Sequence, residues 1–269
     1  MQEFDAVRPD AAHFTSLIAT RQHLMTTASV LPQYGPNVPA VVLVHDAWTD
    51  ASAWSDVISR LQVLGLAVSA IQPPMTSLAV DVGCVHRAIE AHQGAIVLVG
   101  HGWGGAVISQ AGMASPVVAL VYLAAYAPDS GESVEDLRSS QRAPSHADFL
   151  RCDADGLLDF PQDRWVHYFA QDVPLINARV LAATQKPIQS DCLEERLTGA
   201  AWHTRPTWFL VAERDRLIPP ALQRRMAMRM GARVSSVRSS HALFLSRPRE
   251  TTAIILDAVN TIAGQGPSP

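Results

Sequence analysis

The chain has 269 residues, of which 48% are hydrophobic and 17% charged, and its formal net charge is −4. This length favours one α/β domain with an inserted cap. The 21 basic residues form no long block, which argues against nucleic acid or an anionic membrane as a partner. We therefore expect a small-molecule substrate or ligand, and a monomer or homodimer.

Cysteine usage and the N-terminal segment indicate a compartment. Cys84, Cys152 and Cys192 are far apart and odd in number, which argues against a disulfide framework or a thiolate zinc site. No apolar run approaches the roughly 18 residues that span a bilayer, and the acidic start MQEFDAVRPDAAHF is unlike a secretory signal. These features predict a cytoplasmic protein with reduced thiols. No spacing of histidines and carboxylates is typical of a metal site, and we expect no cofactor.

Strand-like and helix-like patterns alternate along most of the chain. Residues 1–38 have weak patterning and end in a Pro/Gly/Asn cluster, so we expect an N-terminal arm with one short helix. After residue 39, β-branched runs alternate with amphipathic segments, which predicts a doubly wound, mostly parallel sheet covered on both faces by helices. The predicted strands are 40–45, 66–71, 95–100, 117–125, 207–212 and 232–237. The predicted helices are 51–64, 80–92, 103–113, 219–230 and 249–262.

Residues 128–203 interrupt this alternation with more charge and several prolines. We interpret them as a helical cap inserted before the last two strands, between core segments 39–127 and 204–269. An aromatic group in this segment is either a set of ligand walls or the core of the cap. Its members are Trp165, His167, Tyr168 and Phe169.

The stretch VLVGHGWGGAVI has glycine spacing typical of a sharp turn from a buried strand into a helix. Such a turn lifts its middle residue above the edge of the sheet, where a nucleophile is displayed. The amide N–H of Trp103, at the start of the helix, would point toward a developing oxyanion. The middle position is held by Gly102, which has no side chain.

At this point the chain resembles the α/β-hydrolase fold, in its small-molecule esterase and hydroxynitrile-lyase-like branch. The likeness extends from about residue 40 to residue 262 and is carried by the following stretches: VVLVHDAWTDASAW, QPPMTSLAVDV, VLVGHGWGGAVI, LVYLAAYAPDSGES, WFLVAERDRLIPP and SSHALFLSRP. In these families the turn supplies Ser, or Asp in the dehalogenase and epoxide-hydrolase branches, so Gly102 marks a vacant nucleophile position. The resemblance makes Asp215 the triad acid and His241 the base.

A second departure lies in VHDAW, where the family normally has His-Gly. The resemblance implies that the amide of Ala47 completes the oxyanion hole and that Asp46 replaces the usual glycine. A carboxylate there would disfavour a developing negative charge unless it were protonated or turned away. Asp46 is therefore either part of the site or an outward-pointing residue of the loop. Two departures together favour natural divergence over an engineered Ser-to-Gly knockout, which stays open.

Several neighbours of these motifs are candidates for the pocket. We expect His45 to hold the oxyanion loop by hydrogen bonds and His101 to pack beneath the turn. Trp48, Trp103 and Tyr126 are expected near the substrate, although each could equally serve packing.

An absent nucleophile limits the chemistry. Gly102 leaves room for about one water between the Trp103 amide and His241, and it rules out an acyl-enzyme at this position. The first hypothesis is a cofactor-free enzyme in which His241 and Asp215 act as a general base on a small, largely apolar molecule, giving hydrolysis or a lyase, isomerase or cyclase step. The alternative is an inactive homologue that binds a small ligand. A third reading is attack by another side chain, nominally Asp46 or Cys84, the latter more typical of a helix core.

Overall fold

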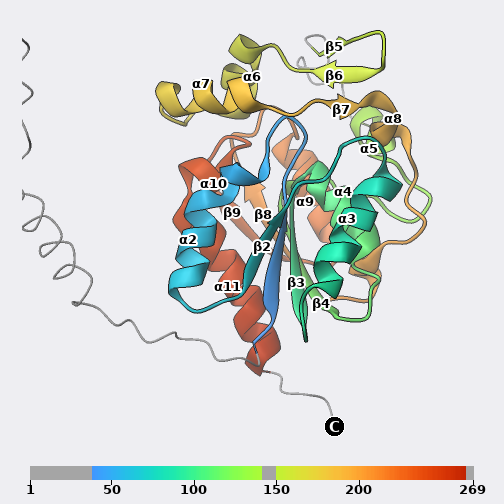
Figure 1. Cartoon of the computed structure of the whole chain (residues 1–269), viewed down its shortest axis with the longest axis vertical. Helices are drawn as coiled ribbons and strands as arrows, with labels where there is room; N and C mark the ends of the chain where they lie inside the picture. The colour runs from blue at the N-terminus through green and yellow to red at the C-terminus, as the bar shows by residue number, and fades with distance from the viewer. Residues whose placement is uncertain (1–37, 141–149, 265–269) are drawn as a thin grey trace, which may run out of the picture.

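The computed structural model describes residues 38–140 and 150–264. Within them, a parallel sheet of six strands in the order β2-β1-β3-β4-β8-β9 runs through the centre (Figure 1). The predicted N-terminal arm helix lies outside the described residues. The strands of the sheet are β1 (Ala40–Val44), β2 (Val68–Ile71), β3 (Ile96–Gly102), β4 (Val117–Ala125), β8 (Thr207–Ala212) and β9 (Arg233–Val237).

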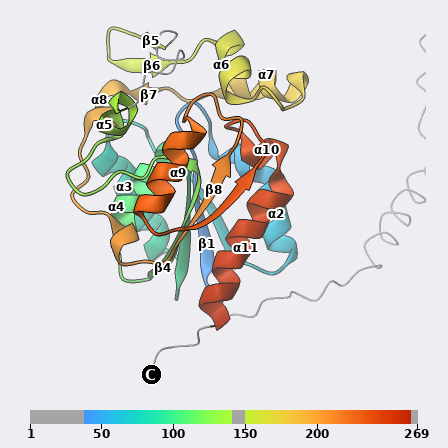
Figure 2. The ribbon, with the colours of Figure 1, turned by 180° about the vertical axis from the view of Figure 1, so that it is seen from behind.

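Helices cover both faces of this sheet, as the alternating pattern predicts. In Figures 1 and 2, α11 and α2 lie together on one face, whereas α3, α4 and α9 lie on the other. The bounds are η1 (Ala51–Trp54), α2 (Ser55–Val63), α3 (Leu78–Glu90), α4 (Trp103–Ala111), α9 (Pro220–Arg229), α10 (Leu243–Ser246) and α11 (Pro248–Gly264). The doubly wound parallel sheet expected from the sequence is confirmed.

The central strands owe their continuous apolar runs to burial on both faces. Every residue of β1 and β3 is buried, so neither strand shows the alternation of a half-exposed strand. Three of the described helices, η1, α3 and the cap helix at Val134–Ser139, begin at a side-chain cap. The side chain of Ser77 accepts a hydrogen bond from the amide of Val80, which starts α3 two residues before the predicted position.

The segment between β4 and β8 carries the cap-like insertion, which lies over one end of the sheet (Figure 1). It contains the helices expected there, and also a three-stranded antiparallel sheet in the order β5-β6-β7. The predicted cap is thus present with its helices, but the sequence did not indicate its small sheet, because strands of two or three residues leave too little periodicity to detect. The elements are α5 (Val134–Ser139), β5 (Arg151–Cys152), β6 (Leu157–Asp159), α6 (Gln162–Phe169), α7 (Leu175–Thr184), β7 (Ile188–Gln189), α8 (Ser190–Glu194) and η3 (Ala201–His203).

The state of the cysteines and the length of the helices also bear on the predictions made from the sequence. All three cysteines are free thiols, and Cys84 lies on α3 as predicted. Among the described helices, none is both long and apolar enough to cross a bilayer.

Candidate functional site

The turn between β3 and α4 has the backbone of a nucleophile elbow. Gly102 lies at its apex with φ 51° and ψ −116°, a conformation that L-residues with side chains rarely adopt. Below it, a Cβ on Gly104 would overlap the carbonyl of Val44 in β1. The glycine spacing therefore reflects a sharp turn made against a neighbouring strand.

The space above Gly102 is filled by the carboxylate of Asp46. A Cβ built on Gly102 would overlap the carboxyl carbon and both oxygens of Asp46. Asp46 Oδ1 accepts a hydrogen bond from the amide of Trp103, and Asp46 Oδ2 lies 2.9 Å from Nε2 of His241. The nucleophile position is thus not vacant, and the room predicted for a water between Trp103 and His241 does not exist. The possibility that Asp46 points outward is also wrong.

His241 is held between two carboxylates. Its Nδ1 lies 2.6 Å from Oδ2 of Asp215, on the side of the ring opposite Asp46. Asp215 is itself fixed, because Oδ1 accepts hydrogen bonds from the amides of Leu217 and Ile218 at 2.7 and 2.9 Å. Oδ2 of Asp215 also accepts one from the side-chain amide of Gln223 at 2.8 Å. The chain order elbow, acid, histidine follows the predicted one.

Burial and charge act in opposite directions on this cluster. Burial disfavours the charged imidazolium of His241, but the carboxylates of Asp215 and Asp46 outweigh it and raise the pKa of His241 to about 10. Burial would raise the pKa of Asp46, yet the hydrogen bond and charge of His241 hold it below its ordinary value. At neutral pH the cluster therefore contains one imidazolium between two carboxylates, of which Asp46 lines the cavity.

The loop that carries Asp46 is fixed on both sides. The carbonyl of Asp46 accepts hydrogen bonds from Nδ1 of His45 at 2.8 Å and from the hydroxyl of Thr49 at 2.9 Å. The next turn contains Trp48 with a positive φ of 58°. The carbonyl of Trp48 accepts a hydrogen bond from the indole of Trp165 in the cap, at 2.9 Å. Asp46 is therefore positioned by the core and by the cap together.

His101 lies beneath the elbow, where the sequence places it. Its Nε2 is 3.0 Å from the carbonyl of His241, and burial together with the charge of His241 lowers the pKa of His101 to about 3. Asp46, His101 and His241 offer ligand atoms within 4.8 Å of one another, a cluster of three that sequence spacing did not reveal. Since a hydrogen bond already joins Asp46 to His241, a metal ion bound there would have to replace the proton shared by these two side chains.

A small cavity opens onto this cluster. Its free volume for the centre of a water molecule is about 20 Å³, close to the space that one water needs. The described residues that line it are Asp46, Ala47, Trp48, Trp103, Tyr126, Arg138, Leu193, Leu217, Ile218 and His241. Most of these walls are apolar, whereas Asp46, His241 and Arg138 bring charge to them.

Comparison with known proteins places this chain in a family. Residues 41–254 match the model of the alpha/beta hydrolase family. The chain belongs to this family. It is 28% identical over 244 residues to the alpha/beta hydrolase nvfD of Aspergillus novofumigatus, a match that covers 82% of this chain and 96% of the relative.

Solved structures show the same hydrolase fold. A pyrethroid hydrolase from Sphingobium faniae superposes with a TM-score of 0.73 at 22% identity, over 84% of this chain and 99% of the other. The methylesterase MES16 from Arabidopsis superposes with a TM-score of 0.70 at 16% identity, over 83% and 100% of the two chains. These likenesses support the fold class that the motifs predicted.

The hydrolase core brings most of the predicted site residues to one place. Ala47, Trp48, Trp103 and Tyr126 all line the cavity with Asp46 and His241. The amide of Ala47 donates no hydrogen bond to another described residue, so it is available to a ligand. The amide of Trp103, predicted to face the same oxyanion, is instead engaged by Asp46.

The aromatic group of the cap contributes packing instead of cavity walls. Trp165 and Phe169 are fully buried and stack on each other with ring centroids 4.6 Å apart, and Phe169 meets His241 edge-on at 4.7 Å. Neither they nor His167 and Tyr168 line the cavity.

Sequence reasoning missed four cavity residues. Leu217 and Ile218 lie two and three residues after Asp215 in the motif ERDRLIPP, so their nearness to the predicted triad acid was a usable signal. Leu193 and Arg138 come from the cap, where no motif distinguished them from other apolar or charged residues.

Proposed function

We propose that this alpha/beta hydrolase family member is a cofactor-free enzyme that moves a proton on a small, largely apolar molecule without forming an acyl-enzyme. The observation that carries this proposal is the Asp46 carboxylate, held by the Trp103 amide and His241 at the elbow apex. It occupies the place where an elbow side chain would point. A proton acceptor, and no serine hydroxyl, occupies the elbow apex.

The roles of the charged groups differ from those of a serine triad. His241 carries a proton at neutral pH because its pKa is raised to about 10, so it is not the group that first accepts a proton from substrate. We infer that Asp46 takes that proton, from a C–H or O–H of the substrate or from a water, while His241 donates its hydrogen bond to Asp46. Asp215 holds the imidazolium in orientation.

A proton taken by Asp46 leaves negative charge on the substrate. The Ala47 amide N–H and the Tyr126 hydroxyl are the polar groups of the cavity wall that could stabilise it. Asp46 can then return its proton to another atom, which gives isomerisation, elimination or cyclisation. Where the acceptor activates a water instead, the outcome is hydrolysis. General-base action of this kind contributes about 10² to 10⁴-fold.

A covalent route through Asp46 is the second candidate, because its carboxyl group lies at the elbow apex. Both of its oxygens already accept hydrogen bonds, which lowers the reactivity of the carboxylate as a base and as a nucleophile alike. His241 is also in direct contact with Asp46, so no water lies between them for a second, hydrolytic step. This contact favours the non-covalent route.

The test uses the full chain with activated esters, 4-nitrophenyl acetate and butyrate, and with acetylacetone in D₂O as a probe of C–H proton exchange. We expect turnover or exchange by the parent protein that falls about 10³-fold in Asp46→Asn, with a smaller fall in His241→Gln. Gly102→Ser should gain no hydrolysis, because Asp46 fills the space of the serine.

Three outcomes would contradict the proposal. An adduct on Asp46, detected by intact-protein mass spectrometry after acid quench, would establish the covalent route. Loss of activity on EDTA treatment and its return with Zn²⁺ would establish a metal at Asp46, His101 and His241. Inertness toward all probes, with hydrolysis gained by Gly102→Ser, would favour the inactive, ligand-binding homologue.

A further inference from the structure

Arg138 introduces a positive charge into a cavity that is otherwise apolar apart from the proton-transfer cluster. It comes from α5 in the cap, and its side chain is 15% exposed. The same cavity is lined by Asp46 and His241. An arginine in such a wall is costly to desolvate unless it has hydrogen-bond acceptors.

The guanidinium is only partly satisfied by the part of the protein that the structure describes. Among the described residues, its hydrogen-bond acceptor is Glu135, one turn away on the same helix, at 2.9 Å from Nη1. Glu135 also accepts a hydrogen bond from the hydroxyl of Ser139, and its side chain is 42% exposed. Arginine has five N–H donors, so residues 38–140 and 150–264 leave most of its donor capacity for something in the cavity.

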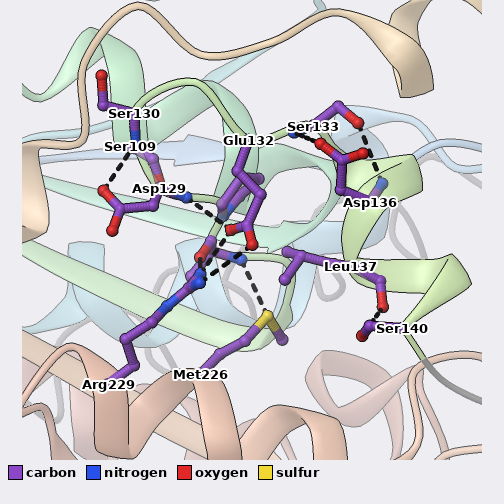
Figure 3. A network of polar contacts seen from close by, with 12 residues as sticks. Ser109, Asp129, Ser130, Glu132, Ser133, Asp136, Leu137, Ser140, Met226 and Arg229 are labelled. Carbon is purple, nitrogen blue, oxygen red and sulfur yellow. Dashed lines mark hydrogen bonds and ion pairs between the residues drawn. The ribbon is translucent and has the colours of Figure 1, made fainter.

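The helix that presents Arg138 is held rigidly. Figure 3 shows Ser133 and Asp136 bonded to each other at the start of α5 as a capping box, and Arg229 paired with Glu132 just before it. Arg229 also donates a hydrogen bond to the carbonyl of Ala127 at 2.6 Å. Since both the approach to α5 and its first turn are fixed, Arg138 is presented in a preorganised position.

Tyr126 relates this arginine to the proton-transfer cluster. Burial raises the pKa of the Tyr126 hydroxyl, Arg138 acts against that change, and Asp46 and Asp215 reinforce it. The Tyr126 hydroxyl is therefore within electrostatic reach of Arg138 as well as of the two carboxylates. The walls of the cavity therefore present a cationic anchor on one side and the Asp46 carboxylate on another.

We propose that Arg138 forms an anion subsite, and that the substrate carries a carboxylate bound by this guanidinium while its reactive group faces Asp46. This rests on the proposed function and names its substrate class. An arginine–carboxylate contact is the strong, planar interaction that spare guanidinium donors favour. Repulsion by Asp46 would turn the carboxylate end of the substrate away from the reacting end, so the two charges together define its orientation.

The experiment measures binding, which does not depend on turnover. Acetate, isobutyrate and phenylacetate are each compared with the corresponding amide by NMR titration of the full chain at pH 7. We expect each acid that fits to bind about tenfold or more tightly than its amide. Arg138→Gln should remove this preference, and Arg138→Lys should retain part of it.

Two further variants separate this proposal from the proton-transfer mechanism. Glu135→Gln removes the internal partner of Arg138 and should tighten acid binding several-fold. Asp46→Asn should abolish turnover while leaving the acid preference intact. Arg196→Gln is the matched control, because Arg196 pairs with Asp136 on the same helix but does not line the cavity.

An absence of preference for acid over amide in every pair, including no binding of any acid, would overturn the anion subsite. So would a preference that survives Arg138→Gln. In either case a loss of turnover in Asp46→Asn would leave the proposed function standing, so the two failures are distinguishable.

Discussion

The loop after β1 and the turn after β3 meet above the same strand ends, yet one carries a reactive type of side chain and the other carries none at the matching place. The turn after β3 retains the backbone of a nucleophile elbow but carries Gly102 at its apex. The loop after β1 has a carboxylate, Asp46, that reaches across into the space above that apex. The comparison teaches that the backbone of one loop can form the elbow while the side chain at its apex comes from the other loop.

Adding a second side chain at the elbow apex should have the largest effect on stability. Gly102→Ser introduces a Cβ that overlaps the Asp46 carboxyl group, so we expect the free energy of unfolding to fall by about 3 kcal/mol or more in urea denaturation. The double variant Asp46→Gly with Gly102→Ser should recover most of this loss, since the overlap is gone.

Gly131→Ser is the control for that experiment. Gly131 also has a positive φ, 78°, but a Cβ there meets nothing within 4 Å, so its loss of about 1 kcal/mol reports backbone strain alone. Equal losses in Gly102→Ser and Gly131→Ser would show that Asp46 does not occupy the apex.

The elbow can be destabilised by removing the carboxylate of Asp81, which holds the indole of Trp103. This carboxylate accepts hydrogen bonds from the indole of Trp103 at 2.8 Å and from the amide of Met75 at 2.9 Å. Asp81→Leu leaves two buried donors without an acceptor, and we expect thermal or urea denaturation to reveal a loss of about 2 kcal/mol. Asp81→Asn keeps one acceptor oxygen and should lose less. A leucine variant as stable as the asparagine variant would contradict this role.

The Asp46–His241–Asp215 cluster should make stability depend on pH. The pKa of His241 is raised to about 10 in the folded protein, against about 6.5 in an unfolded chain. Its contribution is therefore complete below pH 6.5 and is lost as the pH rises through 10. Within that window the free energy of unfolding should fall by up to about 1.4 kcal/mol per pH unit.

Urea denaturation at several pH values between 6 and 10 measures this slope. The pKa of Asp46 is lowered, so its own contribution is lost only in acid, as the pH falls through the folded value. His241→Gln should flatten the alkaline slope. A slope unchanged by that substitution would mean that the imidazole is neutral between the two carboxylates.

The smallest predicted effect concerns the loop after β1. The hydroxyl of Thr49 donates to the carbonyl of Asp46 at 2.9 Å, and His45 donates to the same carbonyl. Thr49→Val preserves the shape and removes one of these bonds, so we expect a loss of about 1 kcal/mol with the alkaline slope intact. Thr49→Ser should be close to the parent. A steep loss of the slope in Thr49→Val would show that this single bond positions the carboxylate.

The core of the fold was predictable because its signals are local. Strand β4 coincides with the predicted range 117–125, and β8 coincides with 207–212, since strands buried on both faces read as continuous apolar runs. The small cap sheet was not predictable, because strands such as β7, with two residues, have no measurable periodicity.

The candidate site was predictable only in part. The motifs identified His241, Asp215 and the elbow because family resemblance carries chain order and local sequence. They did not determine the side-chain direction of Asp46, which depends on the space left by Gly102 some 56 residues along the chain. Arg138 was missed for a similar reason, since nothing in the cap sequence marks which arginine faces inward.

The turn at Trp48 connects the cap to the loop that carries Asp46 through hydrogen bonds. Three hydrogen bonds at 2.9 Å join Trp48 to this region: its amide donates to Lys186, its indole donates to Leu158, and its carbonyl accepts from Trp165. Because Trp48 stands two residues after Asp46, any displacement of these cap segments that enlarges the cavity will pull on the loop bearing the carboxylate. A load on the cap would therefore reach Asp46 through one short stretch of backbone.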